Sequence, residues 1–210
     1  MQIVIPIFDD LTALDAVGPY EVLSRLPEAE VVFAALEPGP KRTETGMLAL
    51  TADHALADVP RPDILVVPGG FGTRQLMHDE AMLEWIRGAH EHSTWTTSVC
   101  TGALLLGAAG VLRGLRATTH WMAMDMLRDL GAEPTLDRVV EQGKVFTAAG
   151  VSSGIDMALT LADRAAGPEV AQAIQLGIEY DPQPPFDAGS PEKAPREIVE
   201  RLRSAGVEAS

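Results

Sequence analysis

The sequence contains very little cysteine: Cys100 is the only one among 210 residues. A single cysteine excludes an internal disulfide bond and a cysteine-rich metal site, and it is compatible with a reducing compartment. The five histidines include no recognisable cluster of metal ligands. The glycine-rich segments lack both the spacing of a dinucleotide-binding loop and the lysine of a phosphate-binding loop. We therefore expect no metal ion and no other cofactor.

Long apolar runs and basic residues are also scarce. No uncharged stretch approaches the length of a membrane span. Residues 1–8 are mostly apolar and lack a basic leader, and Asp9 and Asp10 follow them too soon for a signal peptide. The chain has 16 Lys and Arg against 30 Asp and Glu, a formal net charge of −14. Phosphate backbones and anionic membranes repel such a surface. We expect a soluble, cytoplasmic protein that acts on a small molecule and binds neither nucleic acid nor membrane.

Short apolar segments alternate with helical patterns along the chain. Segments that are apolar throughout predict strands buried on both faces, which are typical of a parallel sheet covered by helices. The predicted class is therefore α/β, with a largely parallel sheet between layers of helices. The predicted strands are 2–7, 30–36, 63–67, 94–99 and a hairpin of 138–141 with 144–147; the predicted helices are 15–26 (with Gly18 and Pro19 in its first turn), 80–92, one from Gly102, 123–130, 152–165 and 169–178.

The length suits one domain over residues 1–210, with a core that ends near residue 180. Residues 181–210 form a tail rich in proline and acidic residues. We expect the first half of this tail to run extended over the surface. Residues 195–205 are predicted to form a final short helix.

Cys100 lies where a predicted strand breaks sharply into a helix. Such a junction holds a side chain outward on a constrained backbone, as for the serine of α/β-hydrolases. The next helix directs its free N–H groups and positive dipole end at that side chain. This placement is expected to lower the thiol pKa from its free value of about 8.5 and to favour the thiolate. The alternative is a buried core cysteine, which is what most lone cysteines are.

Other candidate residues follow the predicted strands and meet Cys100 at the carboxyl edge of the sheet, where open parallel sheets bind ligands. Asp15 is flanked by apolar residues. It either caps its helix or faces Cys100. If it faces Cys100, burial and the nearby thiolate raise the pKa of its carboxyl, which can then hold a proton at neutral pH and donate it. Thr101 brings a hydroxyl and an N–H group, or simply starts the helix.

The turn after the third predicted strand contains Gly69 and Gly70, whose backbone N–H groups can approach a developing negative charge closely. Their alternative role is a tight turn that needs positive φ. His120 is the best placed of the histidines; it is either an orienting residue behind the site or a hydrogen-bonded core residue. Ser152, in the segment after the hairpin, is a second candidate for the surroundings of the site.

Four segments, 14–19, 68–70, 98–102 and 148–156, together resemble the ThiJ/PfpI superfamily, relatives of the class I glutamine amidotransferase domain. The resemblance extends from Met1 to about Tyr180. Within the superfamily, Asp15, Thr101 and the segment 117–121 are similar to the isonitrile (isocyanide) hydratases. The same features resemble the sensor domains of AraC-type regulators, whose helix-turn-helix pair we do not expect in the few residues after Tyr180.

This resemblance implies a flavodoxin-like (Rossmann-like) fold with a nucleophile elbow, and a homodimer. It also implies a hydro-lyase that converts an isonitrile to an N-substituted formamide. Cys100 would attack the terminal carbon to give a thioimidate, Asp15 would supply the proton, and Asp15 or Thr101 would assist the addition of water. The N–H groups of the Gly69–Gly70 turn and of Thr101 would hold the anionic sulfur or a polar atom of the intermediate.

Two departures weigh against other branches of the superfamily. The peptidase branch carries histidine after the nucleophile, where this chain has Thr101, and the branches linked to glyoxal chemistry usually carry glutamate in place of Asp15. Three alternatives to the hydratase stay open. Cys100 would serve a redox or electrophile sensor, the protein would bind a small molecule without turnover, or the thiol would attack aldehydes in a glyoxalase-type or deglycase-type reaction.

Overall fold

The computed structural model describes residues 1–208 and divides the chain into two compact units, Met1–Ile178 and the residues from Glu179 onward. The second unit begins with turns and bends and ends in helix α8 (Arg196–Glu208). Within it, Lys193 forms an ion pair with Asp187 at 2.8 Å. Among the described residues, no helix combines the length and apolarity needed to cross a membrane.

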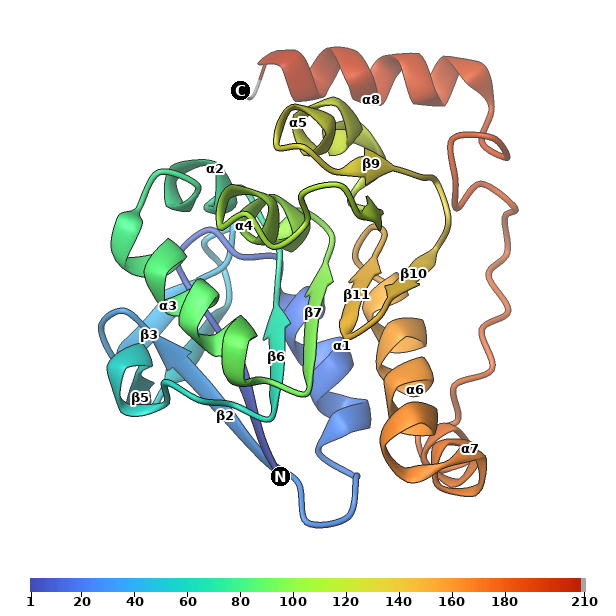
Figure 1. Cartoon of the computed structure of the whole chain (residues 1–210). Coiled ribbons are helices and arrows are strands. Elements are labelled where there is room, and N and C mark those ends of the chain that lie inside the picture. Colours follow the sequence, from blue (N-terminus) through green and yellow to red (C-terminus); the bar gives the residue numbers. More distant parts are fainter. Residues whose placement is uncertain (209–210) are drawn as a thin grey trace. The chain divides into compact units, whose positions relative to one another are not determined.

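The first unit is built around one seven-stranded sheet (Figure 1). Its strand pairs are parallel except for one antiparallel hairpin at an edge, as predicted. The strands, in spatial order, are β10 (Val139–Gln142), β11 (Val145–Ala148), β7 (Trp95–Val99), β6 (Ile64–Val67), β1 (Gln2–Pro6), β2 (Glu30–Ala35) and β5 (His54–Ala55).

Helices cover both faces of the sheet (Figure 1). Helices α3 (Glu80–His92) and α4 (Gly102–Ala108) pack together on one face, where α4 contacts β6 and β7. Helices α1 (Ala13–Leu23) and α6 (Ser153–Ala166) pack together on the other face, and α7 (Pro168–Gly177) packs on α6. All four residues of β6 are fully buried, because both of its faces lie under helices. The α/β, flavodoxin-like prediction is confirmed.

Most predicted elements lie within two residues of the observed ones, but helix α1 differs in an important way. It begins at Ala13, because the Asp15 N–H group donates to the Thr12 carbonyl and closes the first turn there. Pro19 therefore lies inside the helix and not in its first turn, where it removes one helical hydrogen bond. The earlier start places Asp15 in the first turn of the helix.

Several short elements were not predicted, because each has too few residues for an apolar pattern to appear. Four of them are strands that form two small two-stranded sheets apart from the main one. These elements are the pair β3 (Gly39–Arg42) and β4 (Ala49–Ala52), the pair β8 (Arg116–Ala117) and β9 (Glu133–Pro134), the 3₁₀ turns Leu56–Asp58 and Trp121–Ala123, and helix α2 (Thr73–Leu76). Helix α5 (Met124–Asp129) is one residue shorter at each end than the predicted helix 123–130.

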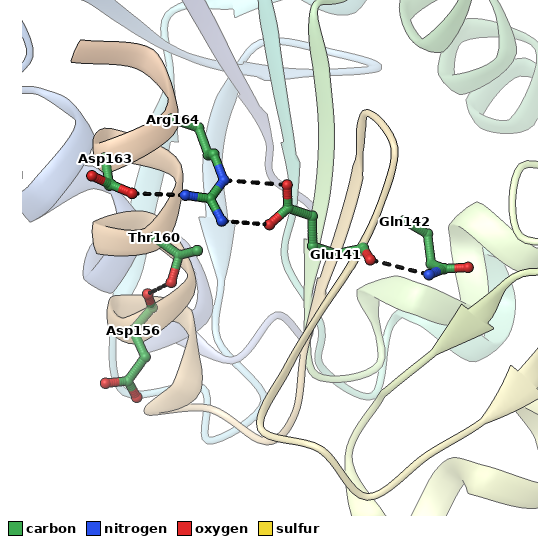
Figure 2. A network of polar contacts seen from close by, with 6 residues as sticks. All are labelled: Glu141, Gln142, Asp156, Thr160, Asp163 and Arg164. Atoms are coloured by element: carbon green, nitrogen blue, oxygen red, sulfur yellow. Dashed lines mark hydrogen bonds and ion pairs between the residues drawn. The ribbon is translucent and has the colours of Figure 1, made fainter. Parts of the chain in front are cut away.

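An ion pair joins helix α6 to the edge hairpin (Figure 2). The Arg164 guanidinium donates two hydrogen bonds to the Glu141 carboxylate on β10, at 3.3 and 3.1 Å, and a third to Asp163. All three side chains are substantially exposed, so solvent and salt screen this pair. Its contribution to stability is therefore small.

Candidate active site at the carboxyl edge of the sheet

The backbone at Cys100 is held in an unusual conformation. Its φ angle is 56°, in the left-handed region that non-glycine residues rarely adopt. Its N–H group donates to the carbonyls of Ala148 and Ala149, at 3.1 and 2.8 Å, and its own carbonyl accepts a 2.8 Å hydrogen bond from the Thr119 hydroxyl. Contacts on both sides therefore maintain the strained turn between β7 and α4, which is the arrangement of a nucleophile elbow.

The carboxyl group of Asp15 lies beside the Cys100 thiol. The side chain is fully buried, and its Oδ2 accepts a 2.9 Å hydrogen bond from the Gly69 N–H group. Among the described residues, Oδ1 has no hydrogen-bond partner of normal geometry, although the carboxyl and the thiol are close enough for each to shift the pKa of the other. An unpartnered, buried carboxyl oxygen next to a thiol is ready to exchange a proton with it.

Burial raises the pKa of Asp15 from 3.8 to about 7. The Gly69 hydrogen bond and the thiol oppose this increase, and the charge of Glu44 adds to it. Desolvation dominates because the charged form loses its hydration inside the protein. The predicted ability of Asp15 to hold a proton near neutral pH agrees with this value.

The Cys100 pKa is the opposite of what the sequence suggested. Burial, and then the charge of Asp15, raise the thiol pKa to about 12, whereas the N–H groups of Val151 and Thr101 lower it by less. Only 5% of the residue is exposed, so the loss of hydration outweighs the N-terminus of the short helix α4. The prediction of a lowered thiol pKa is wrong. The resting nucleophile is a thiol whose nearest base is Asp15.

The glycine turn positions side chains and does not offer free donors to an anion. The Gly69 N–H group bonds to Asp15, and the Gly70 N–H group bonds to the Thr101 hydroxyl at 2.9 Å. A Cβ atom on Gly69 would lie 2.7 Å from that hydroxyl oxygen and 2.8 Å from Asp15 Oδ2, and Gly70 has a φ of +133°. Glycine is therefore required at both positions. The anion-stabilising role expected for these two N–H groups is not supported.

The N–H groups that face the sulfur belong to Thr101 and Val151. Thr101 was predicted for this role, but Val151 was not. Val151 follows β11 and has a φ of 30°, which turns its N–H group toward the site. The segment 150–153 was placed at the correct edge of the sheet, but a backbone donor has no sequence signal of its own.

His120 and Ser152, the two candidates for the surroundings of the site, differ in position. The His120 ring lies against Gly150, where a Cβ atom would be 2.9 Å from His120 Cδ2. It is half-buried, and burial together with the charge of Arg74 lowers its pKa. The Ser152 hydroxyl is exposed and accepts a 3.2 Å hydrogen bond from Arg138, so this contact directs it away from Cys100.

The site lies beside the point where the order of the sheet reverses. From β1 the chain moves to β2 and β5 on one side, and then to β6 and β7 on the other. Asp15 follows β1, the glycine turn follows β6, Cys100 follows β7 and Val151 follows β11. The predicted convergence of four segments on one edge of the sheet is found, at the usual location of ligand sites in open α/β sheets.

A separate hollow of about 260 Å³ opens on the β1–β2 side of this edge, and none of its lining residues is Asp15, Cys100 or Thr101. Among the described residues, no group of three or more histidine, cysteine, aspartate or glutamate side chains is placed to hold a metal ion.

Replacing Thr101 with valine should destabilise the protein by about 1 to 3 kcal/mol, because the buried Gly70 N–H group loses its acceptor. The Thr101 hydroxyl also donates to the Gly70 carbonyl at 3.1 Å, so both contacts disappear together. Urea unfolding measures the change. Thr101→Ser keeps the hydroxyl and should stay within about 1 kcal/mol of the native protein; an equal loss in both variants would contradict this role of the hydroxyl.

A strained cysteine between a parallel strand and a helix, with a buried carboxyl beside its sulfur, defines a nucleophile-elbow α/β protein. Residues 1–164 match the DJ-1/PfpI family, and the chain belongs to that family. The resemblance to the ThiJ/PfpI superfamily is thereby confirmed.

Relatives of known name and structure cover most of the chain. An isonitrile hydratase of Pseudomonas putida is 46% identical over 203 residues, which span 97% of this chain and 89% of that protein. The HTH-type transcriptional regulator CdhR of Pseudomonas aeruginosa is 30% identical over 85% of this chain, which spans 53% of the regulator. A crystal structure of a ThiJ/PfpI family protein from Pseudomonas syringae has a TM-score of 0.95 and 34% identity, and covers 99% of this chain and 86% of that one.

Proposed function

We propose that this protein hydrates an isonitrile, R–N≡C, to an N-substituted formamide. The observation that carries the proposal is the buried pair formed by the Cys100 thiol and the Asp15 carboxyl at the elbow. The similarity to the isonitrile hydratase of Pseudomonas putida over nearly the whole chain supports the same conclusion. A nucleophile and a proton carrier, without a leaving-group site, are what this addition requires.

In the first step, Cys100 attacks the terminal carbon of the isonitrile. Ionised Asp15 takes the thiol proton as the C–S bond forms, and the resulting carboxylic acid delivers that proton to the same carbon. The product is a thioimidate, R–N=CH–S–Cys100. The Thr101 and Val151 N–H groups near the sulfur stabilise the negative charge that develops during the transfer.

In the second step, water adds to the thioimidate carbon. Ionised Asp15 accepts one proton from the water as the C–O bond forms and passes that proton to the imine nitrogen, which leaves a neutral tetrahedral adduct. As the adduct collapses, the carbonyl of the formamide forms and the C–S bond breaks, and Asp15 carries the remaining hydroxyl proton to the departing sulfur. Thr101 does not serve as the base, because its hydroxyl is already engaged with the Gly70 N–H group and carbonyl.

The limited exposure of Cys100 favours a narrow electrophile. Because only 5% of the residue is exposed, a slender electrophile approaches the sulfur with less hindrance than a bulky one. The terminal carbon of an isonitrile carries no substituents and lies at the end of a linear group. An aldehyde or a peptide carbonyl has a substituent on each side of the carbon, and its approach to the sulfur is more hindered.

The sensor alternative is less consistent with the site. Oxidation of cysteine to sulfenic or sulfinic acid proceeds through the thiolate. A thiol pKa of about 12 leaves very little thiolate at neutral pH. Attack assisted by Asp15 avoids this difficulty, because the proton leaves as the new bond forms.

We also propose that the enzyme is a carbon–oxygen lyase (hydro-lyase), that it acts in the cytoplasm and that it forms a homodimer. These assignments follow the family resemblance. Size-exclusion chromatography with light scattering measures the oligomeric state.

When the native protein and an aryl isonitrile are incubated in H₂¹⁸O, we expect catalytic formation of the N-aryl formamide with ¹⁸O in its carbonyl group. The label is expected because the oxygen comes from the added water. Mass spectrometry of the quenched protein should detect an adduct on Cys100 with the mass of the intact isonitrile. A formamide yield equal to that of protein-free buffer would contradict the proposed function.

A further inference from the structure

Arg74 lies at the edge of the candidate active site. It belongs to α2, directly after the glycine turn, and its Nη1 donates to the Gly70 carbonyl at 3.4 Å. The same carbonyl accepts a 3.1 Å hydrogen bond from the Thr101 hydroxyl. The guanidinium also lies over the Phe71 ring, 4.8 Å from its centroid. These contacts hold the positive charge of Arg74 close to Thr101, which follows Cys100.

No carboxylate neutralises this charge among the residues whose side chains the structure describes. The chain has 30 acidic residues and a net charge of −14, and at least seven of its 13 arginines form ion pairs with acidic side chains of the described residues. Arg74 is half-buried and has only a carbonyl and an aromatic ring as partners. A partly desolvated arginine without a counter-ion, in so acidic a protein, favours an anionic ligand.

His120 is a second polar side chain near Arg74. It is close enough to Arg74 for the guanidinium charge to lower its pKa. The Met122 N–H group donates to its Nδ1 at 3.4 Å, so in the neutral ring the proton is assigned to Nε2. The edge that carries Nε2 faces Gly150, the residue before Val151. This N–H donor therefore lies against the backbone segment that leads to Val151, whose own N–H group contacts the sulfur.

We propose that Arg74, together with the His120 Nε2–H group, binds the carboxylate of an isonitrile that carries one, and so places the isonitrile carbon at Cys100. This inference rests on the proposed function and narrows its substrate class to isocyano carboxylates. One guanidinium and one neutral imidazole match a singly charged, planar group. A doubly charged phosphate would leave excess negative charge beside Asp15, which is itself partly ionised near neutral pH.

The experiment compares isocyanoacetate with its neutral ethyl ester. The measured quantity is kcat/KM for each, in the native protein, in Arg74→Gln and in Arg61→Gln. Arg61 is an exposed arginine before β6, at the opposite edge of the sheet, so its replacement makes the same change in net charge away from the site. We expect the native protein to prefer the carboxylate, and the carboxylate-to-ester ratio to fall about 10- to 100-fold in Arg74→Gln but not in Arg61→Gln.

The other outcomes separate a failure of the inference from a failure of the proposed function. If the native protein hydrates both compounds and the ratio is the same in all three proteins, Arg74 does not recognise the carboxylate, while the proposed function stands. If the native protein hydrates an aryl isonitrile but neither of these two compounds, the inference is overturned and the proposed function stands. If it hydrates none of the three, the proposed function fails, and calorimetric binding of N-formylglycinate decides the anion site separately. Binding to the native protein that is lost in Arg74→Gln supports the anion site, and absence of binding to the native protein overturns it.

Discussion

Replacing Cys100 with serine should reduce isonitrile hydration by at least about 10,000-fold, because the residue is the proposed nucleophile and no other thiol is present. A hydroxyl is a much weaker acid than a thiol, so Asp15, with a pKa of about 7, cannot remove its proton effectively. The measurement is formamide formation from an aryl isonitrile under single-turnover and steady-state conditions.

The fold should survive this substitution. The positive φ at position 100 depends on backbone contacts with Ala148, Ala149 and Thr119, and serine preserves all of them. Circular dichroism and the unfolding midpoint therefore serve as the control. A folded serine variant that retains substantial turnover would show that sulfur is not the nucleophile, and the covalent adduct would have to be sought elsewhere.

The Asp15→Asn variant should be about 100- to 10,000-fold slower and, above neutral pH, more stable than the native protein. The activity falls because the amide neither accepts the thiol proton nor delivers it to carbon. The thiol pKa should also decrease, because the charge of Asp15 is one cause of its increase. Alkylation of Cys100 by iodoacetamide at pH 8 should therefore become faster while hydration becomes slower, which separates thiol reactivity from catalysis.

The stability of this variant depends on pH with a definite sign. The pKa of Asp15 rises from 3.8 in the unfolded chain to about 7 in the folded protein. The folded protein is therefore more stable when this carboxyl is protonated than when it is ionised. That contribution is complete below pH 3.8 and is lost as the pH rises through 7. The asparagine variant has no such loss, so its advantage should grow from near zero at pH 4 to as much as about 4 kcal/mol at pH 8.

In thermal unfolding at pH 8, an advantage of this size corresponds to an increase of roughly 10 °C in Tm. The Gly69 N–H group keeps an acceptor, because the asparagine side-chain oxygen can replace Asp15 Oδ2. Equal stability of the two proteins from pH 4 to pH 8 would mean that Asp15 titrates near its ordinary pKa. In that case it could not carry a proton between sulfur and carbon at neutral pH.

The sheet and the location of the site were largely predictable from the sequence. Strands such as β6 are apolar on both faces, which predicts a parallel sheet whose strands all have their carboxyl ends at one edge. Strand β7 ends at the only cysteine, so the sequence also predicts that the site lies at this edge. Asp15 was identifiable because it is an isolated acid among apolar residues. Its raised pKa followed from the same observation, since burial alone determines the direction.

The thiol pKa and the backbone donors were not predictable in the same way. The sequence located Cys100 at a helix N-terminus, which lowers a pKa, but it did not reveal how completely the residue is buried. It also placed Gly69 and Gly70 near the site without showing that their N–H groups are already bonded to Asp15 and Thr101. The helix start at Ala13 depends on a backbone hydrogen bond to Thr12, for which side-chain patterns give no signal.

The shared proton of Asp15 and Cys100 has a consequence for the energetics of the reaction. Between the two pKa values, of about 7 and about 12, the pair carries one negative charge. Transfer of the proton from sulfur to carboxylate relocates that charge over a short distance and leaves its total unchanged. The isonitrile group itself is uncharged and adds nothing to it. The interior therefore experiences no net change in charge during the attack, and the surrounding dipoles, already fixed by the fold, need little reorganisation.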